Sequence, residues 1–157
     1  MSFYTSIAES KPVTGKSGWF QAEPGLGAVL AALGALLVFR LVTLWFSTAA
    51  LGVDEAQYWA WSQELALGYF SKPPLVAFLI SGVTSVCGDS EFCVRLPAVV
   101  LNIATAFVLY LLACRMFDRR TGFWTALTYA LAPGMSLSSI LMTTDVPLLL
   151  FWVIGMY

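Results

Sequence analysis

Four long apolar segments set the pattern of this chain. They run over residues 25–50, 96–117, 122–141 and 146–157. A helix needs about 20 apolar residues to cross the hydrocarbon core of a bilayer, so the first three segments are predicted to span a membrane. The fourth is about half that length and has no polar residue after it. The chain is therefore predicted to be the N-terminal piece of a longer polytopic membrane protein.

The segment between the first two spans, residues 51–95, is predicted to hold two further helices. One covers 54–68, with Asp54 as its N-cap, and the other covers 73–88, which starts with two prolines and ends at a glycine. The second helix, at about fourteen residues, is short for a span. We therefore expect both helices to lie flat at the membrane interface.

The first of these helices has an aromatic face. Tyr58, Trp61 and Leu65 recur at helical spacing, so their side chains share one side of the helix. Trp and Tyr prefer the depth of the membrane interface. Tyr58 and Trp61 are therefore predicted to form an interfacial platform.

The basic residues assign the two sides of the membrane. If both loop helices lie flat, the basic residues at the end of the second span and just after it fall on the same side as those of the N-terminal segment. These are Arg115, Arg119 and Arg120 in one segment and Lys11 and Lys16 in the other. Cytoplasmic segments carry such an excess of Lys and Arg. Residues 1–24 are then a cytoplasmic tail, and residues 51–95 are an outer loop.

Composition agrees with a membrane protein and excludes several functions. Of 157 residues, 59% are hydrophobic and 11% are charged, whereas soluble domains have about 25% charged residues. The mean hydropathy is +0.81. The net charge of −1 and the lack of a basic cluster argue against nucleic-acid binding. With no histidine, this chain supplies no Ser-His-Asp arrangement and no His-ligated zinc.

Two arginines and two cysteines lie in or beside the apolar segments. Arg40 lies within the first span, where a charge needs a partner, and helices outside this chain are expected to satisfy it in preference to a role with substrate. Arg95 is expected to be an interfacial anchor. Cys87 and Cys93 could pair if both face an oxidising compartment, or could be small buried apolar residues.

The predicted topology brings candidate chemistry to the outer face. Carboxylates are available at Asp54, Glu55 and Asp145, and an amine at Lys72. Moving a sugar from a lipid phosphate requires a base for the acceptor hydroxyl and a cation for the developing phosphate charge. It needs no second acidic carboxyl, because the phosphate leaves without a proton, unlike the leaving group of a glycosidase.

These residues fall in three motifs. They are Asp54-Glu55-x-x-Tyr58, Gly68-Tyr69-Phe70-Ser71-Lys72-Pro73-Pro74 and Thr144-Asp145-x-Pro147. Together they resemble the polyprenyl-phosphate-sugar transferases, the superfamily that includes the protein O-mannosyltransferases and the lipid A aminoarabinose transferases. The resemblance covers residues 25–157. It implies an all-α integral membrane protein with the GT-C fold, two membrane-parallel helices in the first outer loop and an inverting mechanism.

The resemblance also implies roles for individual residues. Asp54 stands at the position of the catalytic aspartate, and Glu55 and Asp145 are further catalytic candidates. Lys72 looks like the ligand of the donor phosphate, with Tyr69 assisting it. No cofactor is certain, and a divalent metal ion stays open. The aminoarabinose branch has a glutamate before the lysine and an arginine after the Asp-Glu pair, where this chain has Ser71 and Gln57; this argues against a metal ligand at 71 and against aminoarabinose as the sugar.

Each of these residues has a simpler interpretation. Asp54 and Glu55 could serve only the start of a helix, and Asp145 could cap the next span. Lys72 could bind lipid headgroups without taking part in the reaction.

These residues, together with the resemblance, predict a glycosyltransferase at the outer face of a bacterial inner membrane. Its donor is a polyprenyl-phosphate sugar, and its acceptor is lipopolysaccharide, lipid A or another envelope glycoconjugate, with protein less favoured. The alternative is a multi-span transporter or flippase subunit for a lipid-linked substrate. Transporters generally place ionisable residues at mid-membrane on broken helices. Because Arg40 is the one charge predicted well inside a span, and the other charges lie at the ends of spans or outside them, the enzyme is favoured.

Overall fold

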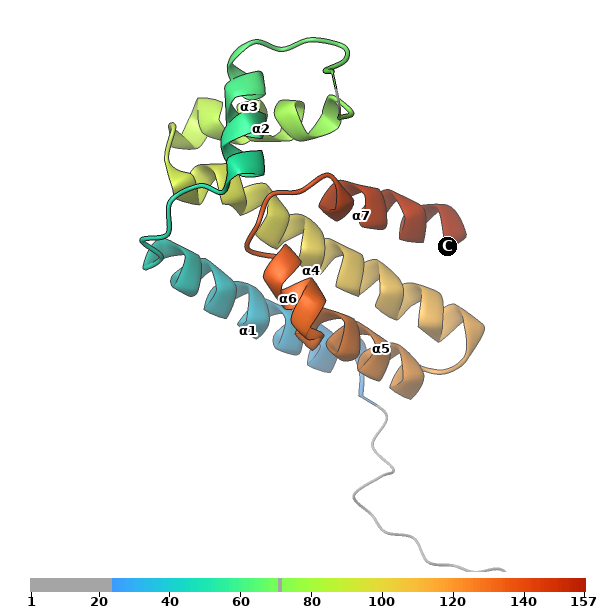
Figure 1. Cartoon of the computed structure of the whole chain (residues 1–157). Coiled ribbons are helices and arrows are strands. Elements are labelled where there is room, and N and C mark those ends of the chain that lie inside the picture. Colours follow the sequence, from blue (N-terminus) through green and yellow to red (C-terminus); the bar gives the residue numbers. More distant parts are fainter. Residues whose placement is uncertain (1–23, 71) are drawn as a thin grey trace, which may run out of the picture.

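The computed structural model describes residues 24–70 and 72–157, and this part of the chain is all-helical (Figure 1). The helices are α1 (Leu26–Trp45), α2 (Val53–Gln63), α3 (Leu75–Cys87), α4 (Glu91–Met116), α5 (Arg119–Leu131), α6 (Pro133–Ser138) and α7 (Asp145–Met156). This architecture confirms the predicted fold class. All but the last residue of the predicted tail at 1–24 lies outside the described residues.

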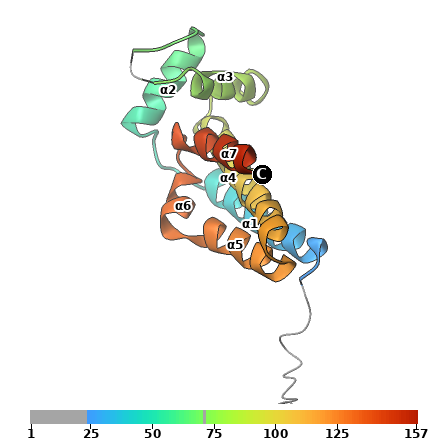
Figure 2. The ribbon, with the colours of Figure 1, turned by 90° about the vertical axis from the view of Figure 1, so that its right-hand side faces the viewer.

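The central helix is α4, which packs against α1, α3, α5 and α7. Helices α2 and α3 pack on each other beyond the end of the bundle where α4 begins (Figures 1 and 2). The loop that leads into α7 also lies at this end (Figure 1). One end of the bundle therefore holds the segments that carry the predicted site residues.

Two helices of the described part, α1 and α4, are long and apolar enough to cross a membrane. Helix α1 ends at Trp45, before the predicted limit of the first span at residue 50. Residues 47–52 have no regular secondary structure, and in this stretch the carbonyls of Ala49 and Ala50 accept hydrogen bonds from a distant arginine, Arg95. Large apolar side chains of α1, such as Phe39 and Trp45, are exposed, as lipid-facing residues would be.

The segment predicted as a third span, 122–141, is not one continuous helix. Helix α5 ends at Leu131, Ala132 is extended with ψ of 132°, and α6 begins at Pro133. Proline has no N–H group, and it disfavours the helical conformation in the residue before it. The Ala132-Pro133 pair therefore explains the break.

Arg40 is buried inside the bundle, and its partners lie on this chain. Its guanidinium donates to Oδ1 of Asn102 at 2.8 Å and to the carbonyl of Ala130. The break after α5 removes the amide that would normally reach this carbonyl, and buried carbonyls need a donor. Arg40 supplies one. The prediction that helices outside this chain satisfy Arg40 is therefore wrong.

Two apolar clusters hold the helices together along α4. The first joins α1, α4 and α5 through Val29, Leu33, Ala106, Tyr110, Ala126 and Ala130. The second joins α2, α3, α4 and the segment around the start of α7 through Tyr58, Val76, Ile80, Val94, Ala98, Met142 and Val146. The second cluster therefore packs α2 and the start of α7 against the same two helices, α3 and α4.

Candidate active site

The candidate site is built around the start of α2. The N-cap of this helix is Gly52, not Asp54 as predicted, and Oε2 of Glu55 accepts a hydrogen bond from the Gly52 N–H at 3.0 Å. Asp54 lies in the first turn with its side chain exposed. A carboxylate is favoured there by the partial positive charge of the helix N-terminus. Asp54 is thus exposed on a helix whose N-terminus is capped by the side chain of the next residue, Glu55.

Glu55 is buried, at 3% exposure, in an ion pair with Arg95 of α4. Nη2 of Arg95 lies 2.7 Å from Oε2, and Nε donates to the carboxylate oxygens at 3.0 and 3.2 Å. The Arg95 guanidinium also donates to the carbonyls of Ala49 and Ala50, each at 3.0 Å. Arg95 is 4% exposed. The prediction of Arg95 as an interfacial anchor is therefore wrong, because it joins α4 to the segment that leads into α2.

The same carboxylate reaches the loop before α7. Oε1 of Glu55 accepts a hydrogen bond from the Met142 N–H at 3.0 Å, and the Met142 side chain is fully buried. Asp145 follows in this segment as the first residue of α7, with its side chain exposed. Glu55 therefore connects the two elements that present Asp54 and Asp145.

The surroundings of Glu55 fix its charge. Burial opposes ionisation, but the hydrogen bonds from Arg95, Gly52 and Met142 outweigh it and hold the pKa of this carboxyl below its ordinary value. Glu55 is consequently ionised at neutral pH. A general base works best when its pKa lies near the operating pH, so this environment makes Glu55 a weak base.

The aromatic face of α2 packs on protein. Tyr58 is 2% exposed and belongs to the cluster that includes Val94 and Val146. Trp61 is half-buried and stacks on Tyr69, with ring centroids 4.6 Å apart and planes 11° apart. The prediction that Tyr58 lies on an interfacial platform is therefore wrong. Helical periodicity placed Tyr58 and Trp61 correctly on one face, and this face is covered by α3 and α4. Leu65 lies beyond the end of α2 and is 49% exposed.

Tyr69 shapes the loop between α2 and α3. Its hydroxyl donates to the carbonyl of Trp61 at 2.8 Å, lies 3.1 Å from the carbonyl of Glu64, and accepts from the Ala66 N–H at 3.1 Å. These contacts occupy groups that the end of a helix leaves without partners. The hydroxyl of Tyr69 is thus engaged within the loop that leads to Lys72.

Lys72 is exposed in this loop, which follows the end of α2 opposite Asp54. The rise of an eleven-residue helix separates the two ends of α2 by about 15 Å. The structure thus gathers Asp54, Glu55 and the segment of Asp145 at one end of α2 and leaves Lys72 and Tyr69 in the loop beyond the other. Ser71 lies outside the described residues.

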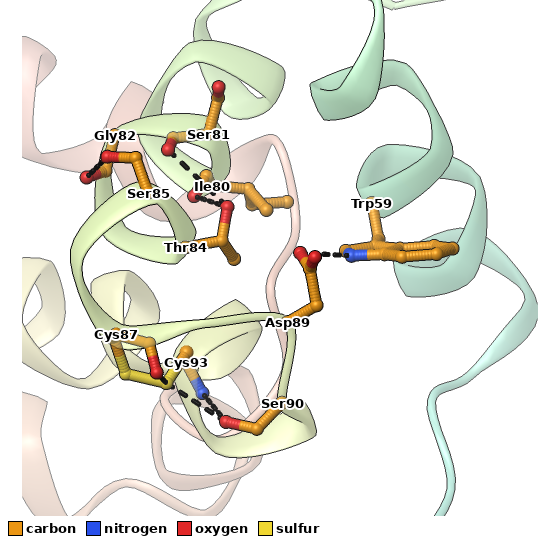
Figure 3. The surroundings of a disulfide bond; sticks show 10 residues. All are labelled: Trp59, Ile80, Ser81, Gly82, Thr84, Ser85, Cys87, Asp89, Ser90 and Cys93. Carbon is orange, nitrogen blue, oxygen red and sulfur yellow. Dashed lines mark hydrogen bonds between the residues drawn. A yellow bond between two sulfur atoms is a disulfide. The ribbon is translucent and has the colours of Figure 1, made fainter.

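Cys87 and Cys93 form a disulfide, with their Cα atoms 5.9 Å apart (Figure 3). The bond joins the end of α3 to the first turn of α4. Between the two cysteines, Asp89 accepts a hydrogen bond from the Trp59 indole of α2 at 3.2 Å (Figure 3). The structure thereby decides the pairing that the sequence left open. The hydrogen bond between Trp59 and Asp89 also connects the α3–α4 turn to α2.

Two hollows lie elsewhere in the described part of the chain, and neither is lined by Asp54 or Asp145. A cavity of about 150 Å³ lies beside Arg95, between the end of α1 and residues 140–141. A larger hollow of about 630 Å³ lies along α5, toward the other end of the bundle, and no carboxylate is among its lining residues. In the described part of the chain, no group of three or more His, Cys, Asp or Glu side chains is placed to hold a metal ion.

Sequence reasoning missed the contributions of Arg95, Asn102 and Met142. A lone arginine beside or within an apolar span was a signal that a buried partner existed, but it did not name that partner. Met142 takes part through its backbone N–H, which every residue except proline has. No residue-type signal could have identified it.

Comparison with known proteins relates this chain to transferases. Residues 71–157 match the family described as dolichyl-phosphate-mannose-protein mannosyltransferase. The chain is 42% identical over 129 residues to the lipid A galacturonosyltransferase RgtD of Rhizobium johnstonii, and this alignment covers 82% of the chain and 27% of that relative. The chain thus spans about a quarter of the relative's length. No solved structure matches the chain.

Proposed function

The chain belongs to the dolichyl-phosphate-mannose-protein mannosyltransferase family, within the GT-C glycosyltransferases, and from this premise we propose that its protein transfers a sugar from a polyprenyl-phosphate carrier to lipid A or a related envelope glycolipid. The observation that carries the proposal is the exposed Asp54 on α2, linked through Glu55 to the segment of Asp145. The name of the Rhizobium relative favours lipid A as acceptor and a uronic acid as the sugar.

In the proposed reaction, Asp54 is the general base. The acceptor hydroxyl gives its proton to the Asp54 carboxylate while its oxygen bonds to the anomeric carbon of the sugar. The bond from that carbon to the phosphate oxygen breaks, and the polyprenyl phosphate leaves with the electron pair. A single displacement of this kind inverts the configuration at the anomeric carbon. Asp145, presented from the neighbouring segment, is the second acidic residue of the proposed site.

Lys72 is the proposed ligand of the donor phosphate, a role that requires its ammonium group to reach back toward Asp54 from the loop beyond the far end of α2. The phosphate gains negative charge as the glycosidic bond breaks, and an ammonium group beside it stabilises that charge. The loop of Lys72 is braced by the stacked pair of Trp61 and Tyr69. In this proposal Tyr69 assists Lys72 by holding the loop, since its hydroxyl already bonds to the backbone there.

We place the site on the outer face of the bacterial inner membrane. Disulfides persist in oxidising compartments such as the periplasm. The bond between Cys87 and Cys93 joins the end of α3 to the start of α4, at the end of the bundle where α2 lies (Figure 1). The basic residues near the α4–α5 turn fall at the other end, where the positive-inside tendency requires them.

This orientation can be tested with single cysteines in a background in which Cys114 and every other free cysteine of the full-length protein is replaced by Ser. Leu67 is 94% exposed in the α2–α3 loop, and Thr121 is exposed at the start of α5. In sealed, correctly oriented vesicles, Leu67→Cys should react with an impermeant thiol reagent added outside, and Thr121→Cys should react only after the membrane is opened. Labelling of Thr121→Cys from outside, with Leu67→Cys protected, would show that the protein has the opposite orientation in the membrane.

The acceptor can be tested with membranes that contain the full-length protein. They are given a radiolabelled polyprenyl-phosphate galacturonate together with lipid A and a Ser/Thr-containing peptide. Label is expected in lipid A. Label in the peptide and none in lipid A would retain the transferase but reject the proposed acceptor.

A further inference from the structure

The hydrogen bonds of Glu55 and Arg95 join three segments of the described chain: the stretch from Ala49 to Glu55, the start of α4 and the loop before α7. Glu55 accepts from the Gly52 N–H at the start of α2 and from the Met142 N–H before α7. Arg95 comes from α4 and donates to the Ala49 and Ala50 carbonyls after α1. The ion pair between them joins these contacts into one network.

We propose that Glu55 and Arg95 act as one positioning unit that sets Asp54 relative to Asp145, and that Glu55 is not itself a base in the reaction. This inference rests on the proposed function. It assigns Glu55 a different role from the catalytic one that the sequence suggested, and it assigns a role to Arg95.

The position of the pair supports this role. Glu55 and Arg95 are 3% and 4% exposed, whereas Asp54 beside them on α2 is exposed. Both oxygens of Glu55 accept hydrogen bonds from buried groups of the protein. A substrate hydroxyl would have to displace these donors to reach the carboxylate. The low pKa of Glu55 agrees with this arrangement, because its proton affinity is already reduced.

The geometry also explains why the unit needs these two residue types. The planar guanidinium of Arg95 donates in several directions, toward Glu55 and toward two backbone carbonyls, which the compact ammonium of lysine cannot reproduce. The glutamate must reach a backbone N–H on each side, at Gly52 and at Met142. Aspartate is one methylene shorter and cannot span both. An exchanged pair, Glu55→Arg with Arg95→Glu, would face backbone groups of the wrong polarity.

A double-mutant cycle in the full-length protein tests the proposal. Glu55→Gln, Arg95→Met and the double variant are compared in the transfer reaction, with rates expressed per folded protein. A displacement of about 1 Å in a catalytic group can lower a rate by about 10²-fold, so each single variant should lose about 10- to 100-fold in kcat with little change in the donor KM. The double variant should be no worse than the poorer single variant, because both changes break the same unit. Glu64→Gln, the same change at an exposed position after α2, should leave kcat unaltered.

The pH profile separates positioning from catalysis. Glu55→Gln should retain the acidic limb of the kcat/KM profile, because Glu55 is not the base in the proposed reaction. Loss of that limb in Glu55→Gln, or single-variant losses that multiply in the double variant, would overturn the proposal. A simple loss of stability would reduce the amount of folded protein without lowering kcat per folded molecule.

Hydrogen exchange at the Met142 amide supplies a readout that does not need the reaction. Exchange should accelerate in Arg95→Met as well as in Glu55→Gln, because the pair acts together. An unchanged exchange rate of the Met142 amide in Arg95→Met would contradict the proposal that Glu55 and Arg95 act as one unit. If a single variant does not fold, Glu55→Asp and Arg95→Lys take its place and should show the same changes, with smaller losses. A wild-type protein with no transfer activity would instead overturn the proposed function.

Discussion

Replacing Asp54 with Asn is expected to lower the rate of sugar transfer by about 10²–10⁴-fold and to leave donor binding nearly unchanged. Asparagine keeps the shape of the side chain but cannot take the acceptor's proton. The structure removes the main alternative explanation for such a loss, since the N-cap of α2 is Gly52 and Asp54 makes no cap that the substitution could destroy. The measurement is the initial rate in the full-length protein, together with the Kd of the donor.

The size of the rate loss distinguishes a general base at Asp54 from a carboxylate that only stabilises the start of α2. A carboxylate in the first turn of an exposed helix stabilises it by about 0.3–1 kcal/mol, and a tenfold change in rate corresponds to about 1.4 kcal/mol. A loss of 10² or more is therefore too large for the helix effect. Asp118→Asn is a matched control, because Asp118 caps α5 at the other end of the bundle and Asn also caps well. If Asp54→Asn keeps activity within a few-fold, Asp54 is not the base.

Replacing Lys72 with Ala is expected to raise the donor KM and to lower kcat, with a combined loss in kcat/KM of about 10- to 100-fold. A hydrogen bond to a charged group contributes about 1.5–3 kcal/mol, and this contact exists before bond cleavage and strengthens during it. Lys72→Arg should recover part of the loss, because Arg keeps the charge but presents a planar fork in place of a compact ammonium.

The control for Lys72 is Lys16→Ala, the same change in the N-terminal segment, which should leave both kinetic constants unaltered. Lys72 could instead bind lipid headgroups. In that case the Ala variant would show weaker membrane association and unaltered kinetics per inserted enzyme. Such a result would reject Lys72 as the ligand of the donor phosphate.

Local sequence signals were sufficient for the helices whose ends they mark. The prolines at 73 and 74 and Gly88 predicted a helix over 73–88, and the structure has α3 at Leu75–Cys87. Gly88 closes it with φ of 88°, a conformation that favours glycine. The first loop helix was less well predicted. It ends at Gln63 and not at 68, because Tyr69 folds the following segment back onto its last carbonyls.

The remaining errors concern partners far apart in the chain. Arg95 pairs with a residue 40 positions away, and Arg40 bonds to a carbonyl 90 positions away. The pattern of apolar residues locates such arginines but does not say which segments fold against them. The same limit applies to Tyr58, because periodicity identifies the apolar face of a helix but cannot tell whether lipid or protein covers it.

The central claim is tested most directly in sealed proteoliposomes that contain the full-length protein. Radiolabelled polyprenyl-phosphate galacturonate and lipid A are supplied, and labelled lipid A and the leaflet of the remaining donor are measured together. The wild-type protein should produce labelled lipid A, and Asp54→Asn should lower the amount of labelled lipid A by at least about 10²-fold. Movement of the donor between leaflets without any labelled lipid A would contradict the account and identify a transporter of the lipid-linked sugar.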